Sequence, residues 1–230
     1  MRSNTNLQNE YENNDICKRC GECCRKGGPA LHKEDMPLIE DGTIELANIV
    51  TLRPGERAYD QIAMSVRPLE AEILKIKGRD GRWTCHFYSP EGCSCGIYES
   101  RPVECEKLFC GDIGPLRDIY NQDRLTRHDL LPEGHPLLEL VEEHDAKCPP
   151  IGMEEIAKKA REGDAEAGRE LKEMVTYDME IRRLVVEKAG ISQEMTEFLF
   201  GRPLKTLLLT MNIKVYEMGD SIRFSFAQGE

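Results

Sequence analysis

The last third of the chain, from Glu154 onward, places apolar residues at the three- and four-residue spacing of amphipathic helices. Asp164 is placed to cap a helix over residues 165–174, because its carboxylate can accept hydrogen bonds from free backbone amides. Further apolar positions over 179–185 predict the next helix, which Gly190 would end. This part of the chain therefore reads as mainly helical.

The pattern changes towards the C-terminus. Ser192 can cap a short helix that runs through Phe200, and Pro203 suits the start of another over residues 204–209. Residues 215–226 then alternate between apolar and polar side chains on both sides of a Gly-Asp pair. This alternation predicts a β-hairpin.

The first 150 residues are less regular. Residues 33–40 and 103–109 favour short helices, while 44–52 fit either a strand or a short helix. Residues 73–76 and 83–88 resemble two strands about a four-residue turn, with Trp83 as a core anchor. Polar residues 1–14 show no periodicity, and we expect a flexible lead-in there.

Composition and charge narrow the classes of function. The chain has 230 residues, of which 40% are hydrophobic, so it can bury a substantial core. Its 42 acidic and 31 basic residues give a net charge of −11, which argues against nucleic acid as a partner. No apolar run approaches the roughly 18 residues of a transmembrane helix, so we expect no membrane association.

Clustered cysteines carry the candidate chemistry. Four of the ten cysteines fall within eight residues, as Cys17, Cys20, Cys23 and Cys24. Two-residue spacings let thiolates converge on one soft metal or on the corner of an iron–sulfur cluster. A second group follows a long cysteine-free stretch and consists of Cys85, Cys93, Cys95, Cys105 and Cys110, with Cys148 alone before two prolines.

Disulfides are the alternative interpretation of an even cysteine count. The sequence starts with polar residues and lacks the apolar segment of a secretion signal, so we expect a cytoplasmic protein whose thiols stay reduced. Adjacent Cys23 and Cys24 would also form a strained bridge. Metal binding is the favoured interpretation.

Two irregular motifs resemble one known family. Cys17-x2-Cys20-Gly21-x-Cys23-Cys24-Arg25 precedes Cys95-x-Ile97-Tyr98-Glu99-x-Arg101-Pro102-x2-Cys105. Both motifs resemble the YkgJ-like cysteine-cluster family, CxxCxxCC, which is described as zinc- or iron-chelating. The resemblance covers about residues 15–150. It implies that Cys85 corresponds to the family's cysteine upstream of the second motif, and Cys110 or Cys148 to those downstream, whereas Cys93 has no counterpart.

We predict an iron–sulfur cluster, a 4Fe–4S cluster in the first place, with zinc as the alternative. The first three cysteine spacings match a bacterial ferredoxin, but its fourth cysteine is missing, so a 4Fe–4S cluster would need a ligand from the second group. Zinc would instead use sets of four thiolates. We predict the ligands among the family-like positions Cys17, Cys20, Cys23, Cys24, Cys85, Cys95, Cys105, Cys110 and Cys148.

Three kinds of function remain open. The metal can be structural or transfer electrons, the protein can hand zinc or iron to a protein client, or it can be an enzyme. The resemblance extends to flagellin lysine methylases at the cysteine cluster, which implies cluster-dependent methyl transfer to a protein lysine as the enzymatic alternative. Tyr98, Glu99 and Arg101 would then be the first candidates for orienting a substrate, and Arg101 could pair with Glu99 or Glu104.

The predicted fold class is α+β. We expect an irregular cysteine-rich metal-binding domain with short strands over residues 15–150, followed by a mainly helical segment over 151–230 that ends in a β-hairpin. Pro149 and Pro150 mark the boundary.

Overall fold

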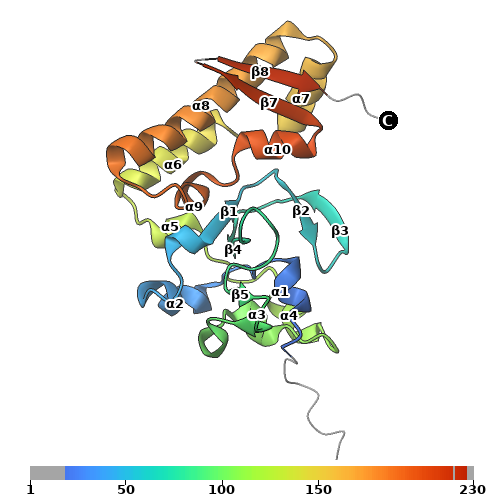
Figure 1. Ribbon diagram of the computed structural model, residues 1–230, viewed down its shortest axis with the longest axis vertical. Coiled ribbons are helices and arrows are strands. Elements are labelled where there is room, and N and C mark those ends of the chain that lie inside the picture. Colours follow the sequence, from blue (N-terminus) through green and yellow to red (C-terminus); the bar gives the residue numbers. More distant parts are fainter. Residues whose placement is uncertain (1–18, 220, 227–230) are drawn as a thin grey trace, which may run out of the picture.

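The computed structural model describes residues 19–219 and 221–226. The expected lead-in over 1–14, Cys17 and the hairpin residue Asp220 lie outside the described residues. The cysteine-rich part of the chain occupies one end of the molecule, and the long helices with the C-terminal hairpin occupy the other (Figure 1). The fold is mixed, with helices and short antiparallel strand pairs, which confirms the predicted class.

The first part is built from short elements. Its central strand pair is β1 (Ile49–Leu52) with β4 (Ile73–Ile76), antiparallel, with Ile49 opposite Ile76. The other strands form the pairs β2 (Arg57–Asp60) with β3 (Ser65–Pro68), and β5 (Tyr88–Ser89) with β6 (Ser94–Cys95). The helical elements are α1 (Glu22–Lys26), η1 (Lys33–Asp35), α2 (Met36–Glu40), η2 (Leu46–Asn48), η3 (Tyr98–Ser100), α3 (Val103–Lys107), α4 (Gly114–Ile119) and α5 (Arg127–Leu130).

The predicted hairpin over residues 73–88 is wrong. β4 pairs with β1, and its continuation meets the later segment only through an isolated bridge between Gly78 and Cys85. Both strands of the β1–β4 pair carry buried apolar side chains, so pairing them with each other buries more apolar surface than a local hairpin would. Residues 44–52, which the sequence left open, contain a 3₁₀ turn followed by β1.

From residue 153 onward the structure follows the helical prediction closely, whereas α6 (Pro136–Lys147) lies before the predicted boundary and was not expected from the sequence. The elements that follow α6 are α7 (Met153–Arg161), α8 (Ala165–Ala189), α9 (Thr196–Phe200), α10 (Leu204–Thr210), β7 (Ile213–Met218) and β8 (Ser221–Phe226). The carboxylate of Asp164 caps α8 by accepting from the amides of Glu166 and Ala167, and Gly190 ends the helix with a φ of 68°. The two segments expected over 165–174 and 179–185 are one continuous helix. No helix in the described part of the chain combines the length and apolar character that crossing a membrane requires.

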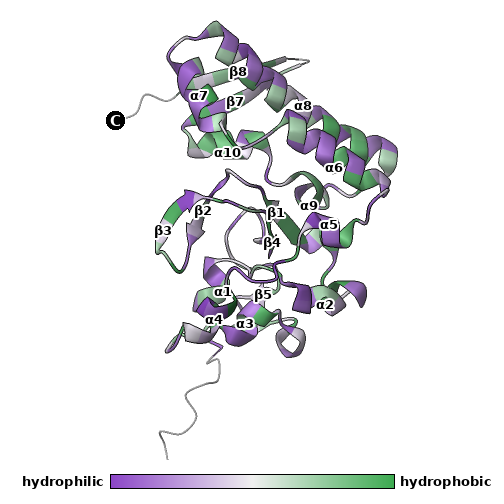
Figure 2. Cartoon of the chain, turned by 180° about the vertical axis from the view of Figure 1, so that it is seen from behind, coloured by the Kyte–Doolittle hydropathy of each residue, from purple (hydrophilic) through white to green (hydrophobic). Residues whose placement is uncertain are grey.

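Buried apolar residues form two clusters. One surrounds the β1–β4 pair and includes Phe198, Leu199 and Phe200 of α9, which contacts β1. The other lies among α7, α8, α10 and the C-terminal hairpin. Because α8 contributes Val185 to the first cluster and Leu171 to the second, one rigid helix spans both. Figure 2 shows β1 as one of the most hydrophobic segments.

A buried polar network lies where the elements of the two parts meet. Asp178 of α8 is completely buried, and its carboxylate accepts from Nε of Arg182 at 2.9 Å and from the Leu204 amide at 2.9 Å. The ring of His144 on α6, also completely buried, lies 2.8 Å from the same carboxylate through Nε2. Nη1 of Arg53, which follows β1, lies 3.3 Å from Nδ1 of His144. Since Arg53 can only donate, Nδ1 accepts and Nε2 carries the proton that His144 donates to Asp178.

Trp83 is not a core anchor, because its side chain is 71% exposed. It lies in the turn after Gly78, where the chain curves away from β4 and no apolar layer covers it. Trp83→Ala should therefore change the free energy of unfolding by less than about 0.5 kcal/mol, as for most surface sites. Phe198→Ala, at a fully buried ring, should cost about 3–5 kcal/mol. Urea denaturation of the two variants checks this, and equal losses would contradict it.

Candidate metal centre

Two cysteines of the first group, Cys23 and Cys24, lie on α1, and Cys20 lies just before it. This helix begins after Gly21, whose φ of 76° is in the left-handed region. A Cβ at this position would lie 2.0 Å from the Tyr88 hydroxyl, so only glycine lets the loop approach this ring. Arg25 strengthens the same contact, because its Nη1 donates to the Cys20 carbonyl and its Nη2 donates to the Tyr88 hydroxyl at 3.0 Å.

The second cysteine group is brought to α1 by backbone hydrogen bonds. The Cys85 amide donates to the Cys24 carbonyl at 2.7 Å, which joins the two cysteine-rich segments directly. Three residues later the chain enters β5, where Tyr88 pairs with Cys95 of β6. Cys93 lies in the turn between these strands with a φ of 45°. These short elements place three thiols beside the first group.

Cys105 is positioned by α3, and α3 is fixed to the N-terminal segment. The Val103 amide donates to the buried Asp35 carboxylate at 2.8 Å. The Glu104 carboxylate accepts from the Ala30 amide at 2.7 Å and lies 3.5 Å from Nε2 of the buried His32. Because Cys105 directly follows Glu104, these contacts hold it near Ala30 and His32, just after the first cysteine group.

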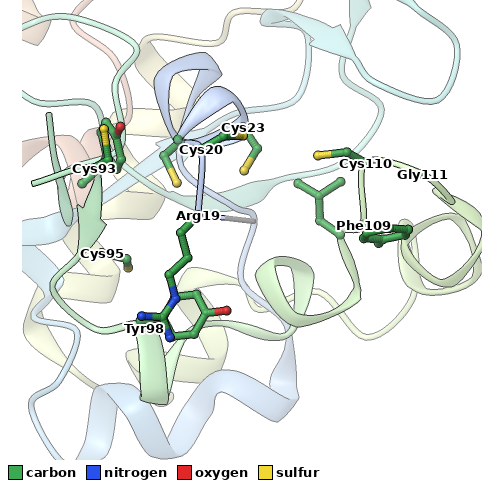
Figure 3. A pocket seen from close by; sticks show the side chains of 13 residues that line it. Arg19, Cys20, Cys23, Cys93, Cys95, Tyr98, Phe109, Cys110 and Gly111 are labelled. Atoms are coloured by element: carbon green, nitrogen blue, oxygen red, sulfur yellow. The ribbon is translucent and has the colours of Figure 1, made fainter. Parts of the chain in front are cut away.

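Most of these cysteines surround one cavity of about 490 Å³. Figure 3 shows Cys20 and Cys23 projecting from α1 and the chain before it, into the space between the strand that carries Cys95 and the loop that carries Cys110. The described residues that line the cavity are Arg19, Cys20, Gly21, Cys23, Cys24, Tyr88, Cys93, Cys95, Tyr98, Leu108, Phe109, Cys110 and Gly111.

The thiols influence one another's protonation. A hydrogen bond from the Cys24 thiol lowers the pKa of Cys23 to about 6, and the same bond raises the pKa of Cys24. Burial raises the pKa of Cys105, and the neighbouring Cys85, Cys23 and Cys95 raise it further. Burial also raises the pKa of Cys85. Five thiols therefore lie within electrostatic reach of one another, and a bound cation would relieve the cost of ionising them.

Arg19, Tyr98 and Arg101 form a stack beside the thiols. The guanidinium of Arg19 lies 3.8 Å from the centre of the Tyr98 ring, and that of Arg101 lies 4.4 Å from it. Arg101 donates to the Tyr98 carbonyl, whereas Glu99, one of its expected partners, lies 3.7 Å from Arg19. These cation–π contacts hold the loop that carries Tyr98, rather than an ion pair between Arg101 and Glu99.

The structure brings together some of the predicted ligands and separates others. Cys20, Cys23, Cys24, Cys95 and Cys110 line the cavity, as does Cys93, for which the resemblance offered no role. Cys85 and Cys105 interact electrostatically with the Cys23 thiol.

The structure places Cys148 elsewhere. This residue is completely buried in the apolar cluster of α7, α8 and α10, and its thiol donates to the Met174 carbonyl at 3.3 Å. Burial raises the pKa of this thiol to about 12, and it does not line the cavity.

The thiols lie near one another, but their positions do not form a complete set of metal ligands. Within residues 19–219 and 221–226, no three side chains of His, Cys, Asp or Glu are placed to hold a metal ion. Thiols must lose their protons to bind a metal, and metal binding is coupled to the folding of the segments that carry them. The donor set itself fits zinc or an iron–sulfur cluster, since both prefer thiolates.

Sequence reasoning missed the other walls of the cavity. Leu108 and Phe109 follow α3 directly, and Tyr88 lies three residues after Cys85. Because these residues lie close to cysteines in the sequence, they could have been predicted to line the site. Arg19 also lies between two cysteines of the first motif, but its stacking on Tyr98 depends on a contact across 79 positions of the chain.

Comparison with known proteins gives one match. Residues 16–114 match the CxxCxxCC family, described as a putative zinc- or iron-chelating domain. Neither the curated proteins nor the solved structures contain a significant match. The matched range contains every residue that lines the cavity, and it ends just after Cys110. The predicted resemblance to the CxxCxxCC family is therefore confirmed over residues 16–114.

Proposed function

We propose that the protein holds a thiolate-ligated metal centre, an iron–sulfur cluster in the first place, at the inner side of the cavity. We call this the resident centre. The observation that carries the proposal is the gathering of cysteines from separate segments around one cavity, where five thiols lie within electrostatic reach of one another. The thiols are those of Cys23, Cys24, Cys85, Cys95 and Cys105.

The walls of the cavity support soft-metal ligation. Among the described residues, the lining contains six cysteines but no histidine and no carboxylate. Hard cations such as magnesium and calcium need oxygen ligands, so this donor set disfavours them. Thiolates favour zinc and iron–sulfur clusters, and a cavity of about 490 Å³ has more room than a single ion needs.

The same lining supports a structural or electron-transferring role over catalysis. General acid–base chemistry usually needs a histidine or carboxylate in the site. The described lining offers tyrosines, thiols and one guanidinium instead. Cys85, which is buried in the apolar cluster around β1 and β4, suits a centre that stays in place and is shielded from water.

Anaerobic purification followed by metal and sulfide analysis tests the proposal. We expect a coloured protein that contains iron and acid-labile sulfide. A colourless protein with stoichiometric zinc would show that the centre at these thiols is a zinc site and not a cluster. A protein with neither metal above the level of a Cys23→Ser, Cys24→Ser double variant would overturn the proposal.

A further inference from the structure

A cluster of largely buried charged side chains adjoins Cys105 but does not line the cavity. His32 is 3% exposed, and the side chains of Glu104 and Arg124 are 13% and 12% exposed. The fourth member is Lys75, which is half-buried. We call these four residues the charged cluster. None of them is a ligand in the proposed function, which leaves their gathering at this place unexplained.

The Glu104 carboxylate joins the members of the charged cluster. It accepts from the Ala30 amide at 2.7 Å and lies 3.5 Å from Nε2 of His32 and 4.0 Å from Nη2 of Arg124. Glu104 also directly precedes Cys105 in the chain. The charged cluster is therefore fixed beside one of the thiols of the resident centre.

Lys75 reaches the same place from the central strand pair. It lies in β4 between Leu74 and Ile76, whose side chains are buried in the apolar cluster. Because side chains alternate along a strand, Lys75 lies on the opposite face of β4. Ala30 forms a backbone bridge with Lys75 and donates its amide to Glu104, so one residue ties the lysine to the carboxylate.

Lys75 lies within electrostatic reach of two thiols of the resident centre. Burial lowers the pKa of its ammonium, and Glu104 is the group that acts most strongly in the opposite direction. The thiolates of Cys105 and Cys85 also raise this pKa. A buried ammonium is costly unless opposite charge lies nearby, and the thiolates of a bound metal centre supply such charge.

Positive charge exceeds negative charge in the charged cluster. Lys75 and Arg124 face the single carboxylate of Glu104, and an arginine stays protonated in proteins. Burial lowers the pKa of His32, but its hydrogen bond with Glu104 outweighs this effect and leaves the pKa raised. The nearby Asp35 carboxylate accepts from two backbone amides. The charged cluster by itself is therefore positive.

We propose that Lys75 is a positioning residue of the resident centre, whose ammonium compensates the negative charge of the thiolates and raises the reduction potential of an iron–sulfur cluster bound there. The inference rests on the proposed function. Reduction adds an electron to a centre that its thiolate ligands already make negative. A cation nearby, where water screens poorly, stabilises the reduced state more than the oxidised state.

Potentiometric titration of the anaerobically purified protein, followed by electron paramagnetic resonance, tests the inference. Lys75→Met removes the charge but keeps an unbranched side chain. At the midpoint potential of the unmodified protein, we expect its ratio of oxidised to reduced cluster to be at least about tenfold higher, which is about 59 mV for a one-electron couple. Lys75→Arg keeps the charge and should stay close to the unmodified protein.

The matched control is Lys77→Met, since this lysine follows β4 but its Nζ donates to the Glu194 carbonyl at 3.0 Å. Its midpoint should not move. Lys75→Gln is a second neutral variant and should shift like Lys75→Met. The inference is overturned if the neutral variants keep the midpoint of the unmodified protein, or if Lys77→Met shifts equally. Loss of the cluster from all three Lys75 variants would show a packing role and would also overturn it.

If the resident metal is zinc, the same compensation is measured as affinity. Thiolates compete with protons for the metal, so loss of a neighbouring cation favours the protonated thiols. We expect Lys75→Met to raise the zinc dissociation constant at least about tenfold in competition with a chelator, and Lys75→Arg to restore it. An unchanged constant would overturn the inference. A protein that holds neither metal is a different result, which rejects the proposed function itself.

Discussion

Replacing Cys85 and Cys105 together with serine should remove the resident metal. Both thiols interact electrostatically with that of Cys23, and serine at both positions leaves only three of the five thiols of the proposed centre. Binding of a structural zinc ion to four ligands is worth about 10–16 kcal/mol, and loss of two ligands removes about half of that. We therefore expect affinity to fall more than about a thousandfold.

Metal content per chain after anaerobic purification measures this effect. Serine keeps the size of the side chain but is a poor ligand for soft metals, which limits the change to ligation. Cys148→Ser should keep its full metal content, because its thiol bonds to the Met174 carbonyl in the other apolar cluster. A double variant that retains stoichiometric metal would show that the centre lies elsewhere.

Asp178→Ala should destabilise the fold by about 3–5 kcal/mol, the usual cost of breaking a buried ion pair by removing one partner. The Asp178 carboxylate accepts hydrogen bonds from Arg182, the Leu204 amide and the His144 ring. Alanine would leave these donors buried without their acceptor. The loss should affect both apolar clusters, because α8 belongs to each.

Urea denaturation followed by circular dichroism measures the change in unfolding free energy. Glu180→Ala is the matched control, since it is an exposed acid on the same helix and should change stability by less than about 0.5 kcal/mol. Asp178→Asn keeps one carbonyl oxygen and should lose less than the alanine variant. A loss below about 1 kcal/mol for Asp178→Ala would show that the network contributes little.

Hydrogen bonds that involve no thiol also hold the cysteine-rich part of the chain together. Asp35 and Glu104 tie α3 to the N-terminal segment, and Tyr88 and Arg25 tie α1 to β5. These bonds, none of which involves a thiol, hold the cysteine-bearing segments near one another. Such ordering lowers the entropy cost of forming the centre.

The sequence alone determined those features whose signals are local. Asp164 and Gly190 mark the ends of α8 because a cap and a left-handed residue act on the adjacent turn. The alternation over 215–226 determined the C-terminal hairpin in the same way. The cysteine spacing likewise identified the metal-binding family, because ligand spacing is itself a local constraint.

Only the tertiary structure decided which segments meet. Apolar residues at 73–76 were correctly expected to form a strand, but its partner β1 lies more than 20 positions away, and burial of both strands selects that pairing. Trp83 is exposed although its alternating pattern suggested a core. Burial also separates the cysteines, because Cys85 is buried, Cys20, Cys93 and Cys110 are exposed, and Cys148 is buried in the other apolar cluster. Spacing along the chain carries no information about depth, because depth depends on what packs over each residue from distant parts of the sequence.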